Sequence, residues 1–357
     1  MNILLIRLRL IGDVVFTTPL PRALQRAYPG SRITYVVERP AAAVVDGNPY
    51  IDEVIVVDRP RGLARLAADL RLARLLRRQR FDLVLDLHGG PRSAWLAWAT
   101  GAPQRIGYDI AGRAWMYTRT APRPRELRPR HSVMNQWDLL EAIDGWPGGR
   151  PDPAADAVEM PLDAGADGRI VERLRARGIG ADDELIVLHV SAGNPFRRWP
   201  ETAFAEVVAA LAGESAVRRI VLSSGPSDRE AANRIAAAAR LRLGEAASRV
   251  VDFGEFDLSE LRALIARARL FVGGDTGPLH VAATTNTPIV GIYGPTLAAR
   301  SAPWRDPRAP TESVEVDGLA CRPCDQRACA PGDFRCLTTL KPSEVISAAA
   351  RALRAGA

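Results

Sequence analysis

Residues 270–296 read LFVGGDTGPLHVAATTNTPIVGIYGPT and predict a strand, a tight turn, a helix and a second strand in immediate succession. The apolar run 270–272 enters two glycines, after which Asp275 and Thr276 are placed to cap a helix. Pro288 cannot continue that helix, and the apolar run after it is typical of a buried strand. A strand that ends in glycines and leads into a helix offers an anion free backbone amides and the positive end of the helix dipole. The stretch therefore predicts a phosphate site.

Taken alone, this fragment is explained equally well by an ordinary buried strand–helix–strand unit, with Asp275 as a helix cap and His280 as a packed histidine. The pattern of residues is more specific than an ordinary strand–helix–strand unit requires. The run resembles the nucleotide-sugar signature of the ADP-heptose:lipopolysaccharide heptosyltransferase family, in which an Asp-Thr-Gly-x-x-His turn precedes a helix and a Tyr-Gly-Pro-Thr turn closes the site. The matching positions are Asp275, Thr276, Gly277, His280, Gly294, Pro295 and Thr296, of which the first four are donor-binding candidates.

The N-terminal stretch begins in a similar way, with an apolar strand at 3–6 that turns through Gly12 and Asp13 into a helix. Asp13 is expected just beyond the carboxyl end of the strand, at the edge where ligands bind in open α/β sheets. From the residues alone, such a carboxylate is more often a helix cap than a catalytic group. The opening also resembles that of the same family, in which this aspartate is the proposed general base. The resemblance therefore implies a catalytic role for Asp13.

The chain has 357 residues, of which 47% are hydrophobic, so it can bury a sizeable core and its length favours two domains. Strands and helices alternate on both sides of a Pro/Gly-rich linker at 145–168, which predicts α/β domains with parallel sheets. We expect an N-terminal acceptor-binding domain at 1–150 and a nucleotide-sugar-binding domain at 168–340. Both should be Rossmann-like and face a cleft, as in the GT-B glycosyltransferases. That resemblance also implies that a final helix within 341–357 packs back on the first domain.

The expected strands are 3–6, 33–37, 54–57 and 83–87 in the first half and 185–190, 220–223, 250–253, 270–272 and 289–292 in the second.

Residues 189–200, HVSAGNPFRRWP, follow the first strand of the second half. The resembled family has a lysine two residues before the Trp-Pro pair, where this chain has Arg197. The resemblance implies that Arg197 holds the leaving diphosphate, that Ser191 lies on the donor side and that Asp228 binds ribose hydroxyls. From the residues alone, a salt-bridged arginine pair and an ordinary acid in the first turn of a helix are the alternatives.

The run 81–108 also resembles the family, in its acceptor-side loop. Arg92 and Ser93 follow a strand there, and an arginine at this edge can hold an acceptor carboxylate or phosphate through paired bonds. The resemblance therefore makes both residues acceptor-binding candidates. The structural alternative is that the neighbouring glycines only form a turn and that Ser93 only caps the following helix.

The net charge is +7, but all 48 basic residues except Lys341 are arginine, so compositional bias explains the charge as well as acidic partners do. An amphipathic, arginine-rich helix at 59–80 is either a solvated face over a core stripe or a contact with anionic lipid. The N-terminal apolar stretch is too short for a signal peptide, and no apolar run has membrane-spanning length. We expect a cytoplasmic protein whose membrane contact is at most peripheral, at the inner face of the inner membrane.

The four cysteines all lie within CRPCDQRACAPGDFRC, at Cys321, Cys324, Cys329 and Cys336. Persistent disulfides are unusual in the cytoplasm, so the cluster indicates either free thiols or a structural Zn or Fe–S site. The first two have the spacing of a chelate turn, but no second pair of that spacing follows, so the zinc-ribbon pattern is not met. Free thiols are the preferred interpretation.

The resemblance, together with these features, implies an inverting glycosyltransferase that moves a heptosyl residue from ADP-heptose to an inner-core (lipid A-Kdo or heptose) or lipid-linked lipopolysaccharide acceptor. Asp13 would take the proton from the acceptor hydroxyl, Arg197 and the amides of Thr276 and Gly277 would stabilise the diphosphate, and Asp275 would hold sugar hydroxyls. No metal need bridge the diphosphate, because the helix terminus and Arg197 supply positive charge.

Two other classes of protein also fit parts of this sequence. One is another nucleotide-sugar enzyme with two Rossmann-like domains, such as an epimerase, which needs no acceptor. The other is a basic nucleic-acid-binding protein with a cysteine metal site. Its aromatic residues should interleave with basic ones, whereas the aromatics here amount to 6% and are scattered. A nucleic-acid partner is therefore not expected.

Overall fold

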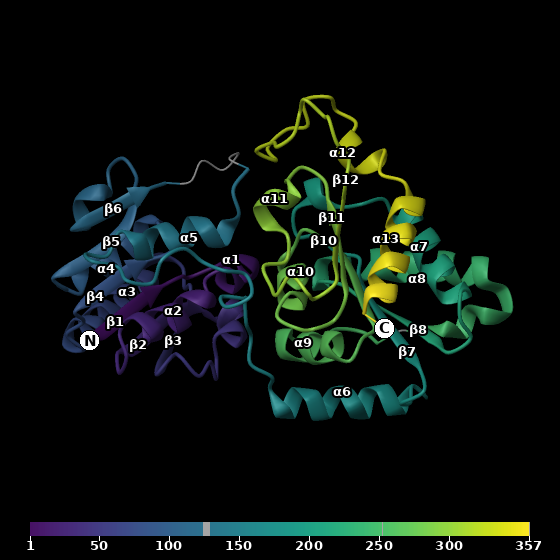
Figure 1. Ribbon diagram of the computed structural model, residues 1–357, viewed down its shortest axis with the longest axis horizontal. Helices are drawn as coiled ribbons and strands as arrows, with labels where there is room; N and C mark the ends of the chain where they lie inside the picture. The colour runs from purple at the N-terminus through teal and green to yellow at the C-terminus, as the bar shows by residue number, and fades with distance from the viewer. Residues whose placement is uncertain (124–128, 252, 357) are drawn as a thin grey trace. The chain divides into compact units, whose positions relative to one another are not determined.

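The computed structural model describes residues 1–123, 129–251 and 253–356. They form two compact units, Met1–Pro161 and Leu162–Ala357 (Figure 1). The division falls inside the linker predicted at 145–168. Each unit is a six-stranded parallel sheet with helices packed on it, which confirms the predicted α/β class with two Rossmann-like domains.

The sheet of unit 1 has the strand order β3-β2-β1-β4-β5-β6, and every pairing in it is parallel. Its strands are β1 (Asn2–Ile6), β2 (Arg32–Glu38), β3 (Glu53–Val57), β4 (Leu83–Asp86), β5 (Gln104–Asp109) and β6 (Arg119–Pro122). Its helices are α1 (Ile11–Val15), α2 (Pro19–Ala27), α3 (Gly62–Arg78), α4 (Pro91–Ala99) and α5 (Ser132–Glu141), with 3-10 turns η1 (Arg39–Val44) and η2 (Ala114–Met116). This is the Rossmann order, which reverses direction between β1 and β4.

Unit 2 repeats the same order, written β12-β11-β10-β7-β8-β9, and its pairings are also parallel. Its strands are β7 (Glu184–His189), β8 (Arg218–Ser223), β9 (Val250–Val251), β10 (Leu270–Gly274), β11 (Ile289–Tyr293) and β12 (Thr311–Glu315). Its helices are α6 (Ala164–Ala176), α7 (Glu201–Gly213), α8 (Arg229–Leu243), α9 (Leu258–Ala266), α10 (Gly277–Ala282), α11 (Ala298–Ser301), α12 (Arg335–Thr338) and α13 (Pro342–Ala355), with 3-10 turns η3 (Pro195–Arg197), η4 (Pro226–Asp228) and η5 (Gly244–Arg249). Here the order reverses between β7 and β10.

Helices α3 and α4 pack on one face of the unit 1 sheet. The buried side of α3 consists of Leu72, Ala73 and Leu76, which lie in one cluster with strand residues such as Leu4 and Val84. A fully buried leucine contributes roughly 2 kcal/mol to the free energy of folding, so the second half of α3 is the part that anchors it. The first turns of the helix bury little.

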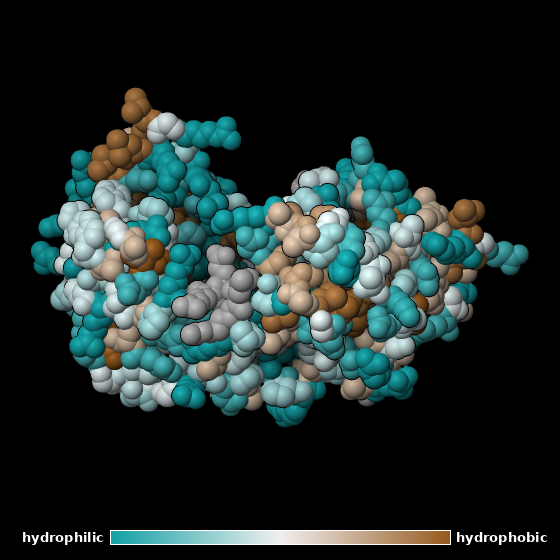
Figure 2. All heavy atoms as spheres, turned by 90° about the horizontal axis from the view of Figure 1, so that it is seen from above, coloured by the Kyte–Doolittle hydropathy of each residue, from teal (hydrophilic) through white to brown (hydrophobic). Residues whose placement is uncertain are grey.

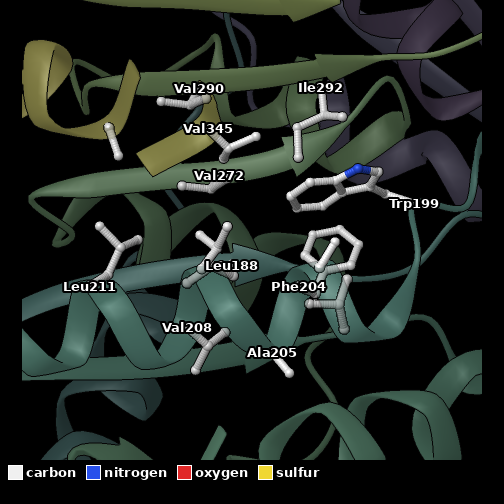
Figure 3. Packing of buried hydrophobic residues seen from close by; sticks show 14 of the residues in the cluster. Leu188, Trp199, Phe204, Ala205, Val208, Leu211, Val272, Val290, Ile292 and Val345 are labelled. Carbon is white, nitrogen blue, oxygen red and sulfur yellow. The ribbon is translucent and has the colours of Figure 1, made fainter. Parts of the chain in front are cut away.

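The last helix belongs to the core of unit 2. Val345, Ala348, Ala349 and Ala352 of α13 are buried in one cluster with α7 and the central strands, and Figure 3 shows Val345 beside Val272 of β10 and Val290 of β11. The expected packing of this helix on the first domain stays a prediction. The apolar side of α13 packs against the sheet of unit 2, beside β11 and β12.

In each unit, the two central strands end at the same level. Ile6 of β1 lies opposite Asp86 of β4, and His189 of β7 lies opposite Gly273 of β10. Because the strands are parallel, the segments that follow them meet at one edge of each sheet, where ligands bind in such folds. Over the described residues, no helix combines the length and the apolar character needed to cross a membrane.

Candidate functional site

Asp13 lies in the first turn of α1, directly after β1 at the reversal point of unit 1. Arg7 holds its carboxylate, with 2.5 Å between Arg7 Nη2 and Asp13 Oδ2. The backbone amide of Leu10 donates more weakly to the same oxygen, at 3.4 Å. Arg7 is buried and also donates to the carbonyl of Leu87, which follows β4. The Asp13 side chain is 43% exposed, so the carboxylate is held in one orientation and is still accessible, as a general base requires.

His88 lies at the same edge, on the segment after β4. Burial and the charges of Arg7 and Arg9 lower its pKa to about 4, although Asp13 opposes the shift. The imidazole is therefore neutral near pH 7 and lies in the field of the same groups that surround Asp13. A side chain at Gly90 would come within 2.7 Å of the imidazole, so the glycine makes room for it. Local sequence does not reveal that His88 and Asp13 share Arg7 as a neighbour.

Asp86 fixes the shape of the loop that carries His88. It is fully buried and accepts hydrogen bonds from Tyr117 Oη at 2.6 Å, from Ser93 Oγ at 2.9 Å and from the amides of His88 and Gly89, both at 2.9 Å. Burial raises the pKa of the Asp86 carboxyl in spite of these donors. The carboxyl group therefore acts as an internal brace for the loop.

Ser93 is enclosed within this loop. Its side chain is fully buried, donates to Asp86 and accepts from the amide of Gly90 at 3.0 Å. These contacts favour the structural alternative, a cap of helix α4. Its hydroxyl is enclosed and already paired, and the acceptor-binding role of Ser93 stays a prediction.

Arg92 is enclosed in a similar way, and its acceptor-binding role also stays a prediction. Its side chain is only 8% exposed. Its Nε donates to Asp69 at 2.8 Å, one terminal nitrogen donates to Glu38 at 3.2 Å, and the other donates to the carbonyl of Asp58 at 3.2 Å. Since three acceptors from three segments use its donors, the guanidinium ties α3, β2 and α4 together and does not present a free fork to a ligand.

In unit 2, Asp275 follows β10 and is 3% exposed. Its Oδ2 accepts from Thr296 Oγ1 at 2.5 Å and lies 3.3 Å from Arg197 Nη1, while Oδ1 lies 3.3 Å from His280 Nε2. Burial opposes ionisation, but His280, Arg197 and Thr296 outweigh it and lower the pKa of Asp275 to about 2. Asp275 therefore joins the turn after β10 to α10 and to the second glycine turn.

The predicted capping role of Asp275 is not seen. Thr276 is the N-cap of α10 by position, but its Oγ1 donates to the carbonyl of Gly274 at 3.3 Å and makes no cap bond. Backbone bonding within the helix begins with the amide of Leu279, which donates to the carbonyl of Thr276 at 3.1 Å. The amides of Thr276 and Gly277 precede that bond, so they have no partner within the helix.

Arg197 ends the short turn η3 after β7 and is 29% exposed. Its Nη1 donates to the carbonyl of Asp275 at 2.7 Å, and its Nε donates to Gln326 Oε1 at 2.8 Å. Asn194 Nδ2 donates to the same Gln326 oxygen at 2.9 Å. Gln326 lies between the second and third cysteines, and its contact with Arg197 joins the cysteine-rich segment to the donor-side residues. A glutamine in an irregular loop carries no sequence signal for such a contact.

Asp228 and Ser191 lie together at the carboxyl ends of β7 and β8. Both are buried, and the Ser191 hydroxyl donates to Asp228 Oδ2. Arg198 Nη2 lies 2.8 Å from the other carboxylate oxygen. The predicted donor residues of this edge therefore do converge, although each carboxylate oxygen of Asp228 already has a protein partner.

The four cysteines are free thiols that line one small, mostly apolar cavity of about 90 Å³. Cys336 is buried, and burial raises the pKa of its thiol. Within the described residues, no group of three or more His, Cys, Asp or Glu side chains is arranged to hold a metal ion. A structural Zn or Fe–S site at Cys321, Cys324, Cys329 and Cys336 thus has no support from this arrangement.

Comparison with known proteins adds an independent result. The sequence model of glycosyltransferase family 9 (heptosyltransferase) matches residues 69–331. Lipopolysaccharide heptosyltransferase 3 of Escherichia coli is 26% identical over 304 residues, which cover 83% of this chain and 84% of that one. The crystal structure of the glycosyl transferase family 9 from Veillonella parvula has a TM-score of 0.82 and 26% identity, covering 99% of this chain and 97% of the other. An E. coli heptosyltransferase solved with ADP shares the fold, with a TM-score of 0.71, 22% identity and coverage of 99% and 100%.

Proposed function

The chain belongs to glycosyltransferase family 9, the heptosyltransferase family, and we propose that it transfers a heptosyl residue from ADP-heptose to a lipopolysaccharide acceptor with inversion at the anomeric carbon. The proposal rests on the family match together with the two groups of polar residues at the reversal points of the two sheets. The ADP named in the E. coli heptosyltransferase structure supports an adenine nucleotide as the carrier of the sugar.

In the proposed reaction, the acceptor hydroxyl oxygen forms a bond to the anomeric carbon while the bond from that carbon to the diphosphate oxygen breaks. The hydroxyl proton passes to the carboxylate of Asp13, and ADP leaves with the bonding electrons. Arg7 holds the carboxylate through Oδ2, so the orientation of the base is set before the acceptor arrives. The imidazole of His88 is neutral, so Arg7 is the positive group that pairs with this base.

Arg197 is the proposed partner of the leaving diphosphate. The geometry supports it, because Gln326 and the carbonyl of Asp275 fix two of its nitrogens while 29% of the side chain stays exposed. The free amides of Thr276 and Gly277 add donors where negative charge develops. This arrangement of Arg197 beside unpaired helix amides is the observation that carries the donor assignment.

The remaining donor contacts are proposals of the same kind. Asp228 and Ser191, at the ends of neighbouring strands, would form hydrogen bonds with the ribose hydroxyls. The ion pair between Arg198 and Asp228 would then break, or Asp228 would bind Arg198 and the ribose at the same time. Asp275 and His280 would meet the sugar or diphosphate only at their exposed edges, because both are nearly buried. For the acceptor side we propose Asp13 and its surroundings, with Arg92 and Ser93 as supports of that edge.

The acceptor is proposed to be lipid-linked, which places the enzyme at the inner face of the inner membrane through peripheral contact. The name of the E. coli relative, lipopolysaccharide heptosyltransferase 3, supports this class of acceptor.

A panel of nucleotide sugars tests the donor. ADP-heptose should raise the melting temperature of the purified protein, and the shift should grow with ligand concentration as expected for binding to the folded state. UDP- and GDP-sugars should give much smaller shifts. Stabilisation by a UDP-sugar alone would remove the ADP-heptose assignment. An epimerase, the other function considered, would convert the nucleotide sugar without any acceptor, whereas a transferase should leave it intact until an acceptor is added.

A further inference from the structure

Helix α3 of unit 1 carries three exposed leucines on one side. Leu63 is 85% exposed, Leu66 59% and Leu70 38%. Their spacing of three and four residues aligns them along the helix. A single exposed leucine is ordinary, but three in line on an arginine-rich helix form an apolar ridge. Figure 2 shows hydrophobic side chains that project from the surface of the molecule beside hydrophilic ones.

The surface around the ridge is positively charged. Residues 59–80 contain eight arginines and a single acidic residue, Asp69. Asp69 is buried and pairs with Arg92 at 2.7 Å, so its charge is turned inward and compensated there. By contrast, Arg59, Arg61 and Arg74 are exposed, and within the described part of the chain the structure shows no ion pair for any of them.

The ridge is also fixed to the edge that carries Asp13. Helix α3 follows β3, whose carboxyl end lies at the same edge as those of β1 and β4. Arg92 joins the two regions, since it pairs with Asp69 of α3 and donates to the carbonyl of Asp58 just before the helix. A surface that binds α3 therefore also fixes the orientation of the sheet edge that carries Asp13.

We propose that the face formed by Leu63, Leu66, Leu70, Arg59, Arg61 and Arg74 docks unit 1 on an anionic phospholipid bilayer. Leucines in line can enter the boundary between headgroups and acyl chains, while long arginine side chains reach the lipid phosphates with their aliphatic parts along the apolar surface. The positive charge favours an anionic bilayer over a protein partner. A protein would have to place several acidic groups opposite these arginines, whereas the lipid phosphates are spread over the whole bilayer surface.

This inference deepens the proposed function, because a docked α3 brings the Asp13 edge toward the layer in which a lipid-linked acceptor lies. It does not depend on the donor or on the reaction. Vesicle binding is therefore measured without nucleotide sugar and without acceptor, so that failure of the docking surface and failure of the transfer reaction are told apart.

The experiment uses the full-length protein and two kinds of vesicle, phosphatidylcholine alone and phosphatidylcholine with phosphatidylglycerol, in a sedimentation assay. The wild-type protein should sediment with the anionic vesicles at least tenfold more strongly than with the neutral ones. The double variant Leu63→Ser/Leu66→Ser should lose at least tenfold in binding to the anionic vesicles. Its melting temperature should stay close to that of the wild type, because both side chains are largely exposed.

Leu241→Ser is the matched control, since Leu241 is 86% exposed and lies between two arginines on α8 of unit 2. It should bind vesicles as the wild type does. Arg59→Glu/Arg61→Glu should abolish the preference for anionic vesicles, and added salt should weaken wild-type binding. Equal binding of the wild type and the Leu63/Leu66 variant, or an equal loss in Leu241→Ser, overturns the proposal. So does a wild-type protein that ignores phosphatidylglycerol.

Discussion

Arg197 is held by two different acceptors, and this decides what substitutions there should do. Its Nε and Nη1 reach Gln326 and the carbonyl of Asp275 at the same time. A lysine carries one ammonium group and cannot occupy both positions, although it keeps the positive charge. The sequence suggested that arginine simply replaces a lysine here; the contacts show that its planar geometry is used.

We therefore expect Arg197→Ala to weaken ADP-heptose binding and turnover by more than tenfold, a loss that corresponds to more than about 1.4 kcal/mol. Arg197→Lys should recover the charge but not the fixed position, and so give intermediate values of both. Calorimetric titration and transfer assays on the two variants measure this order. Full recovery by lysine would show that charge alone matters, and a lysine no better than alanine would show that the geometry is decisive.

The lowered pKa of His189 predicts how the free energy of unfolding changes with pH. Burial lowers its pKa from 6.5 to about 4, so the folded protein keeps the imidazole neutral at a pH where the unfolded chain binds a proton. Its contribution to stability is complete above pH 6.5 and is lost as the pH falls from 6.5 toward 4, with a slope of up to about 1.4 kcal/mol per pH unit.

His189→Gln should accordingly flatten the fall in the free energy of unfolding between these two pH values, as measured by urea denaturation. His88, with a similarly lowered pKa of about 4, contributes equally in both proteins and cancels from the difference. The slope is the informative quantity, because the substitution also changes absolute stability. An unchanged slope would mean that His189 is protonated in the folded protein or does not titrate in this range.

At the scale of elements, strands with a sustained apolar run could be predicted, including the edge strands β3 and β9, and strands without one could not. Strands β1, β2, β4, β7, β10 and β11 are continuous apolar runs because both faces of a parallel sheet are buried. Strands β5, β6 and β12 were missed. In β12 only Val314 is buried, and β6 is a short edge strand that ends in a proline, so neither has a sustained apolar pattern.

The site follows the same division. Asp13 and Arg197 were predicted from the family resemblance, while the ends of the buried strands before them and before the turn after β10 indicated only an edge where ligands can bind. The buried role of Arg92 depends on Glu38 and Asp69, which lie 54 and 23 residues away. Such pairings are set by how the sheet folds, so local sequence cannot reveal them.

The cysteine-rich segment also has a clearer role in the structure than in the sequence. Its sequence indicates only a cluster of thiols, whereas in the structure Gln326 of this segment contacts Arg197 and Asn194. The segment is itself packed against the second glycine turn, since a side chain at Gly294 would lie 2.5 Å from Leu337 of α12.

We expect Gln326→Ala to weaken ADP-heptose binding by about threefold to tenfold, because a partly exposed hydrogen bond to a charged group is lost while Arg197 keeps its charge. The matched control is Arg327→Ala, at the next position, where the side chain is 86% exposed. It should bind the donor as the wild type does. Equal effects of the two changes would indicate a general disturbance of the loop, and no effect of Gln326→Ala would remove it as a positioning residue.

For the whole molecule, the repetition of one strand order in both units gives two ligand edges, one with Asp13 and one with Arg197. The proposed division of labour is that unit 2 binds the donor and unit 1 supplies the base and the acceptor edge. Donor binding should then be insensitive to changes in unit 1, while turnover should depend on both.

Calorimetric titration of ADP and ADP-heptose tests this division. Asp13→Ala should leave both affinities within about twofold, because a base that acts on the acceptor contributes to turnover and not to donor binding. Asp275→Asn should weaken both, since the neutral side chain no longer balances Arg197 and His280. A loss of ADP binding in Asp13→Ala would place the nucleotide in unit 1 and reverse the assignment of the two units.

The most direct test of the central claim is a transfer reaction analysed by mass spectrometry. Purified protein is incubated with ADP-heptose and a heptose-deficient lipopolysaccharide acceptor, and the acceptor is weighed before and after. The wild-type protein should add one heptosyl residue and release an equal amount of ADP, and Asp13→Asn should slow this by about two to four orders of magnitude. An acceptor of unchanged mass while ADP-heptose is consumed, or an Asp13→Asn variant as fast as the wild type, would contradict the account.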